Sequence, residues 1–198
     1  LGHQPDGTAQ IDTLDSRISS NVIYQNGKLF MVRTVNVSNK SAIRWTVLDE
    51  ATNAVVSEGT IANSNFDYYQ GSIAINATGD VVLGFNRSGT GTSDFIGSYA
   101  RVGKFDGTNI TFGTDIVLQS GLANYHLIGG AGERWGDFSA TRLDPTDSSL
   151  FWTFQEFAGT NNNWQTQVTA IRINSSVPEP SVLMPIIGTG SLGIFLFS

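Results

Sequence analysis

One local pattern occurs three times in this chain, and it constrains the fold more than any other feature. Each copy is an apolar alternating run, a turn containing Asn or Asp, and a second apolar run, at residues 20–32, 72–85 and 140–154. Alternation with a period of two puts every second side chain on one face, which is typical of a half-buried strand. The copies begin roughly 50–70 residues apart. The sequence therefore predicts an all-β fold made of repeated hairpins.

The first copy carries the clearest turn signal. Asn26-Gly27 separates an apolar run at 18–24 from another at 29–37. Asn-Gly favours a two-residue hairpin, because both residues tolerate the positive φ that such a turn requires. Two more runs, at 42–48 and 54–61, follow after short polar turns. We therefore expect a four-stranded antiparallel meander here.

Three such meanders are expected, at about residues 14–62, 70–119 and 134–174, in a body that covers residues 1–176. Four-stranded meanders repeated at this spacing are typical of β-propeller blades. About three blades cannot close a propeller, which has about 4–8, so we expect a partial propeller that belongs to a larger one. The third copy shows only three good strands before the tail. A propeller commonly completes such a blade with a strand from its N-terminus, which is a further reason to expect the C-terminal part of a larger propeller. The alternative fold is a β-sandwich of about ten strands.

The C-terminal part differs from this body. Val177-Pro178-Glu179-Pro180 cannot continue a helix or a strand, because each proline fixes φ and lacks an N–H. An uncharged apolar run with several glycines follows at residues 182–197. As a helix it measures about 24 Å, against a hydrocarbon thickness of about 30 Å, and its small residues suit a membrane helix. We expect a hydrophobic helix here; the alternative is a buried C-terminal strand or helix of the domain.

Residues 177–198 resemble the PEP-CTERM sorting signal of Gram-negative bacteria, with Pro178, Glu179 and Pro180 matching its motif. The resemblance implies an exported protein of the cell envelope or the extracellular space. It also implies transient anchoring in the inner membrane and processing by an exosortase. The family's terminal arginine-rich cluster is missing after Leu196-Phe197-Ser198, so either the chain is clipped or the signal is degenerate. Residues 1–15 carry no signal peptide, so an export signal is expected upstream.

Composition excludes several classes of function. A net charge of −6 with only 14% charged residues disfavours binding to nucleic acid. The absence of cysteine excludes disulfides, thiolate metal sites and cysteine nucleophiles. His3 and His126 stand alone, and the turn at residues 144–147 offers too few oxygen ligands for calcium. We therefore predict no metal site and no cofactor.

The segment that opens the third meander holds the candidate ligand-binding residues. Arg134-Trp135-Gly136-Asp137-Phe138-Ser139, together with residues 151–157, resembles blades of secreted bacterial propellers related in shape to sialidases. In this interpretation Trp135 stacks on a sugar, while Arg134 and Asp137 bind its hydroxyl groups. In the alternative, Arg134 and Asp137 pair with each other and Trp135 packs between blades.

The sequence does not assign catalytic residues. A glycosidase needs two carboxyl groups on either side of the scissile bond, and no spacing selects a pair from Glu133, Asp137 and Glu156. The arginine triad with a tyrosine nucleophile that characterises sialidases is also missing. Whether the protein is an enzyme stays open, with a non-catalytic module for adhesion or polysaccharide and matrix binding favoured. The alternative is an extracellular propeller-type glycoside hydrolase or lyase with part of its catalytic residues elsewhere.

Overall fold

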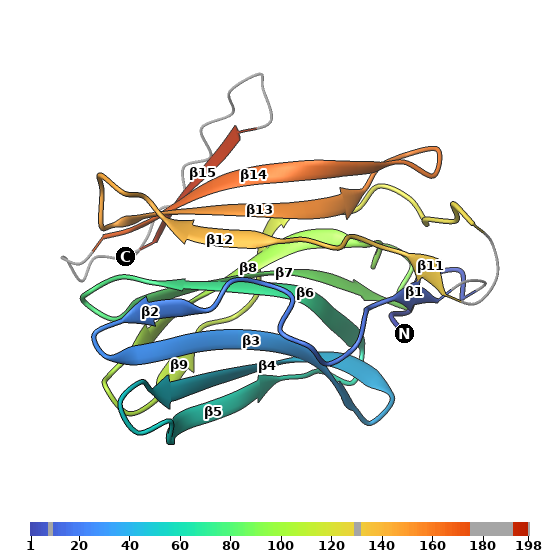
Figure 1. The fold of residues 1–198 in the computed structure, drawn as a ribbon. Helices are drawn as coiled ribbons and strands as arrows, with labels where there is room; N and C mark the ends of the chain where they lie inside the picture. The colour runs from blue at the N-terminus through green and yellow to red at the C-terminus, as the bar shows by residue number, and fades with distance from the viewer. Residues whose placement is uncertain (8–9, 129–131, 175–191, 198) are drawn as a thin grey trace.

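The computed structural model describes residues 1–7, 10–128, 132–174 and 192–197, and for the last of these ranges the backbone alone. All regular structure in these residues is β, so the predicted all-β class is confirmed (Figure 1). In the part of the chain that the structure describes, there is no helix with the length and apolarity needed to span a membrane. The sorting motif, Val177 to Pro180, lies outside the described residues.

The first sheet is an antiparallel meander whose strands follow chain order. Its strands are β2 (Ile23–Gln25), β3 (Lys28–Val37), β4 (Lys40–Asp49) and β5 (Val55–Ile61). Asn26 and Gly27 have φ values of 49° and 73°, so the predicted Asn-Gly hairpin between β2 and β3 is confirmed. Ser38 and Asn39 make a second turn with positive φ, which joins β3 to β4.

The middle sheet is also antiparallel and has both faces covered. Its strands are β6 (Phe66–Ile75), β7 (Asp80–Gly89), β8 (Gly97–Phe105), β9 (Ile110–Phe112) and β10 (Ile116–Gln119). Strands β9 and β10 both pair with β8. Nearly every residue of β6 and β7 is buried, including polar ones such as Asp67, Gln70 and Asn86, so neither strand shows strict alternation of apolar and polar residues.

The last sheet contains β12 (Ala140–Leu143), β13 (Leu150–Ala158), β14 (Trp164–Ile173) and β15 (Leu192–Phe197). The first three are antiparallel, but β15 runs parallel to β14. The predicted C-terminal helix is therefore wrong for residues 192–197. A short run of Leu, Ile and Phe can extend a sheet, and the edge of β14 offers unpaired backbone groups over Val168–Ile173.

Strand β1 (Ile11–Asp12) pairs in parallel with β11 (Glu133–Arg134) and is not part of the last sheet. The fourth strand of the last sheet is β15, which pairs with β14.

The three sheets stack in the order first, middle, last (Figure 1). The alternative β-sandwich needs two packed sheets, whereas the described residues form three large sheets and the two-stranded sheet of β1 and β11. Strand β6 contacts β2, β3 and β4 on one side and β12 on the other. The interface between the first and middle sheets is mainly apolar, with Phe30, Ile43, Trp45, Leu83 and Phe85 in its core.

The interface between the middle and last sheets is of two kinds. At one end Val82, Phe151 and Ile171 form an apolar cluster. Toward the other end buried polar side chains meet: Ser72 lies 2.8 Å from the hydroxyl of Thr141 and accepts a hydrogen bond from Gln155 at 3.1 Å. These hydrogen bonds offset part of the cost of removing the polar groups from water, although Gln155 Oε1 is buried without a partner among the described residues.

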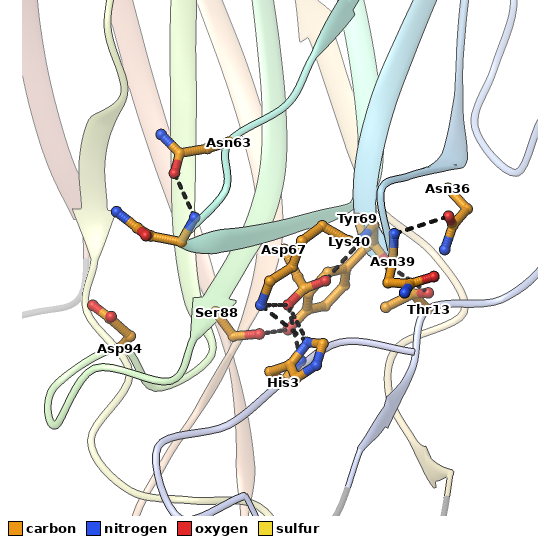
Figure 2. Close-up of polar contacts among 12 residues, drawn as sticks. His3, Thr13, Asn36, Asn39, Lys40, Asn63, Asp67, Tyr69, Ser88 and Asp94 are labelled. Carbon is orange, nitrogen blue, oxygen red and sulfur yellow. Dashed lines mark hydrogen bonds and ion pairs between the residues drawn. The ribbon is translucent and has the colours of Figure 1, made fainter.

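The N-terminal segment is fixed to this stack through the buried carboxylate of Asp67 on β6 (Figure 2). Its Oδ2 accepts hydrogen bonds from His3 Nδ1 at 2.7 Å, His3 N at 3.1 Å and Lys40 Nζ at 3.2 Å. Its Oδ1 accepts from Ser41 N at 2.8 Å. Nearby, the hydroxyl of Tyr69 donates to Ser88 at 3.0 Å. The side chain of Asp67 has no exposure to solvent, and its hydrogen bonds with His3, Lys40 and Ser41 offset the cost of removing the carboxylate from water.

Candidate binding groove

A groove lies beside the loop between β11 and β12, at the end of the last sheet. It encloses about 390 Å³. We call it the aromatic groove, and its lining consists of Tyr125, Leu127, Ile128, Arg134, Trp135, Gly136, Asp137, Phe138, Glu156 and Trp164. The structure thus brings all three sequence-predicted ligand-binding residues to one groove and adds residues from three other segments.

Large apolar side chains in this groove face solvent. Phe138 is 81% exposed and Trp164 is 52% exposed, and Leu127 and Ile128 are both more than half exposed. Phe138 belongs to the loop before β12, and Trp164 is the first residue of β14. Exposed aromatic rings beside polar groups are a common feature of binding surfaces. The groove therefore presents two ring faces that sequence analysis had not selected.

Trp135 does not have the role that the first interpretation gave it. Its side chain is buried, with an exposed fraction of 2%, and its ring packs edge-on against Tyr125 at 5.0 Å between ring centres. Its Nε1 donates a hydrogen bond to Asn86 Oδ1 at 3.1 Å. Because its side chain is buried, Trp135 supports the wall of the groove, whereas the rings of Phe138 and Trp164 face solvent.

Asn86 connects the middle sheet to this wall. Its side chain is buried on β7, and its Nδ2 donates to the carbonyl oxygens of Gly97 at 2.9 Å and Glu156 at 2.5 Å. Its Oδ1 accepts the Trp135 indole N–H. One amide thus fixes both the Trp135 loop and the end of β13 that carries Glu156. No local sequence signal marks Asn86, since its partners are 49 and 70 residues away.

An irregularity in β6 supports the same loop. The register of β6 shifts between Tyr69 and Ser72, and Gln70 has a φ of 51°. The side chain of Gln70 donates to the Trp135 carbonyl oxygen at 3.3 Å. Gly136, which follows, has a φ of 54°, a region where a residue without a side chain is least strained. The bulge and the glycine together set the path of the loop.

Two carboxylates in the groove have different surroundings. Asp137 accepts a hydrogen bond from Arg134 at 2.8 Å, and both side chains are exposed, as the alternative interpretation expected. Burial raises the pKa of Glu156, and the nearby charge of Asp137 raises it further. Sequence spacing did not select this pair. The third candidate, Glu133, is buried and accepts the backbone N–H of Ile128 at 2.8 Å, so it supports the chain.

The other sequence candidates have structural partners. His3 contacts Asp67, and His126 Nε2 lies 2.6 Å from Asp6. In the turn at 144–147, Asp144 accepts hydrogen bonds from Thr146 and from the Trp152 indole at 2.9 Å. In residues 1–7, 10–128 and 132–174, no three His, Asp or Glu side chains gather as metal ligands would.

A second charged cluster lies on the middle sheet and combines two arginines with a tyrosine. Asp115 accepts hydrogen bonds from Arg87 at 2.8 Å, Arg101 at 2.6 Å and the Tyr68 hydroxyl at 3.1 Å. Arg87 is stacked 4.1 Å from the ring centre of Tyr99. Burial, and then the charge of Asp115, raise the pKa of Tyr68 to about 12. Asp115 forms hydrogen bonds with both guanidinium groups, and the phenol of Tyr68 stays protonated at neutral pH. These contacts stabilise the sheet.

No family model, curated protein or solved structure matches this chain.

Proposed function

We propose that this protein is an exported, non-catalytic module that binds polysaccharide, either for adhesion or for attachment to an extracellular matrix. The aromatic groove carries the proposal. It combines solvent-facing rings at Phe138 and Trp164 with the polar groups of Arg134 and Asp137. Sugar rings have apolar faces and polar edges, so a ligand of this type uses both kinds of group.

The remaining features of the groove agree with recognition of a sugar. The ion pair between Arg134 and Asp137 leaves guanidinium donors and carboxylate lone pairs for hydroxyl groups. Buried contacts from Asn86 and Gln70 hold the loop in place, and a fixed site loses less entropy when a ligand binds.

Affinity electrophoresis against neutral polysaccharides, namely β-glucan, xylan, mannan and galactan, tests this function. We expect retardation by at least one of them and its loss in Trp164→Ala and Phe138→Ala. Tyr24→Ala is the matched control, because Tyr24 is 61% exposed but lies on the first sheet. Equal mobility of the wild type with and without every polysaccharide would rule out the proposal.

A glycoside hydrolase is the second candidate function, and the meeting of Asp137 and Glu156 in one groove favours it. The raised pKa of Glu156 suits a proton donor, and Asp137, which is held by Arg134, offers the second carboxyl group. In this reaction Glu156 protonates the glycosidic oxygen and the bond to the anomeric carbon breaks. Water forms the new bond to that carbon, and Asp137 accepts the proton that the water loses. Reducing-end release that disappears in Glu156→Gln, with binding retained, would support hydrolysis over binding alone.

The tail and the sheets support two further parts of the proposal. We infer that Pro178-Glu179-Pro180 is a sorting motif read by an exosortase, on its resemblance to the PEP-CTERM signal. Replacing Pro178, Glu179 and Pro180 with alanine should block processing in the native host. Unchanged processing would contradict the sorting role.

We also infer that the stacked sheets are blades of a partial propeller, because β6 contacts both β2 and β12, and these three strands open the three sheets.

A further inference from the structure

We propose that the aromatic groove is one end of a longer binding platform on the outer face of the last sheet, and that its ligand is an extended glycan chain. This inference depends on the proposed polysaccharide-binding function and specifies its ligand class. The observation that carries it is a second pocket, which adjoins the aromatic groove and shares Phe138 and Glu156 with it.

The second pocket lies over the strands of the last sheet. Its remaining lining residues are Ser139, Ala140, Phe154, Gln155 and Thr166. Phe154 is 40% exposed on β13, and Thr166 is exposed on β14. The second pocket thus adds a third solvent-facing aromatic ring beside the groove.

Strand register fixes the direction and length of this platform. Trp164 pairs with Ala158, Thr166 with Glu156, and Val168 with Phe154. Because alternate residues share a face, Trp164, Glu156, Thr166 and Phe154 all point away from the middle sheet. The opposite face is the one whose Thr153 and Gln155 are buried against the middle sheet.

Trp164 and Phe154 are therefore separated by four residue steps along the strands, which is about 13 Å. This span exceeds a single sugar ring. A ligand that contacts both rings at once must consist of several sugars in an extended chain.

The chemistry of the second pocket favours a chain without charge. Apart from Glu156, its lining is uncharged: aromatic rings, the hydroxyl groups of Ser139 and Thr166, and a methyl group. The chain as a whole carries a net charge of −6, which repels acidic polysaccharides at low salt. The platform is therefore complementary to a neutral, polyhydroxylated polymer, which offers ring faces to Phe154 and hydroxyl groups to Thr166.

The dependence of affinity on chain length tests this inference. The probes are oligosaccharides from disaccharide to octasaccharide, prepared from whichever of the four neutral polysaccharides binds best, and affinity is measured by titration calorimetry. We expect wild-type affinity to rise with length until the chain reaches Phe154. Phe154→Ala should weaken octasaccharide binding by about tenfold and leave disaccharide binding unchanged.

Phe154→Tyr, which keeps a ring, should restore the octasaccharide affinity, and Tyr24→Ala should behave as the wild type. Trp164→Ala should weaken binding at every length. If Trp164→Ala abolishes binding but affinity shows no dependence on length, the polysaccharide-binding function stands and the extended platform is wrong. If Phe154→Ala weakens short and long chains equally, the platform is also wrong. Failure of all four polysaccharides to bind would remove the function and the inference together.

Discussion

Replacing Asp67 with asparagine should destabilise the protein, because this carboxylate is fully buried among donors. The substitution keeps the shape of the side chain and an acceptor for Ser41 N, but it removes the charge that faces His3 and Lys40. It also turns an amide N–H₂ group toward the three donors supplied by His3 and Lys40 if the amide oxygen stays on Ser41. Removing one partner of a buried ion pair costs about 3–5 kcal/mol.

The lower part of that range applies here, because the side chains of Lys40 and His3 keep 17% and 29% of their exposure and can recover water. We therefore expect Asp67→Asn to lower the free energy of unfolding by about 3 kcal/mol. For a chain of this size, that corresponds to a drop in Tm of about 6–12 °C.

Thermal and urea unfolding, followed by circular dichroism, measure this change. Asp15→Asn is the matched control, because Asp15 pairs with Arg17 where both side chains are largely exposed, and it should unfold like the wild type. A Tm for Asp67→Asn within experimental error of the wild-type value would refute the reasoning that this carboxylate holds the N-terminal segment to the stack.

Two further predictions concern acid and packing. The pKa values of Asp49, Asp144 and Asp147 are lowered to about 2, chiefly by hydrogen bonds from Lys28 to Asp49, from the Trp152 indole to Asp144 and from the Ser149 hydroxyl to Asp147. Because these pKa values are lower in the folded state, the ionised carboxylates stabilise the fold above the unfolded pKa of about 4, and this stabilisation is lost as the pH falls toward 2. The urea concentration at the unfolding midpoint should therefore decrease between about pH 4 and pH 2. The decrease should be smaller in Asp144→Asn. Gly84→Ala should lower stability by about 1–3 kcal/mol, because its new Cβ would collide with Thr153, while Gly113→Ala, with only an ordinary contact, should be tolerated; equal urea midpoints for the two would contradict this.

Local turn chemistry was the most predictable part of the fold. Asn26-Gly27 adopts the positive φ values that its sequence favours, and the hairpin that it joins forms as expected. The tail was less predictable, since a short uncharged run such as residues 192–197 satisfies the pattern of a helix or of a strand. In the structure, this run forms a strand because it pairs with backbone groups at the open edge of β14. The position of that edge depends on the rest of the sheet, so the run alone does not specify the outcome.

The binding groove shows the same division. The segment at 134–139 was recognisable as a candidate, because it opens the third repeat and combines an aromatic ring with two opposite charges. Which aromatic ring faces solvent was not recognisable: Trp135 is buried, while Phe138 and Trp164 are exposed. The burial of Trp135 depends on its contacts with Tyr125 and Asn86, which are not its neighbours in the sequence.

By itself, the sequence determined the all-β class and the hairpin turns, because period-two alternation and Asn-Gly chemistry act between neighbouring residues. It also determined the acidic, cysteine-free character that excludes thiol chemistry. Only the tertiary structure decided how the sheets stack, where the last six described residues pair, and that Asp137 meets Glu156 beside two exposed rings. Those outcomes depend on contacts between residues far apart in the chain, and no local pattern specifies them.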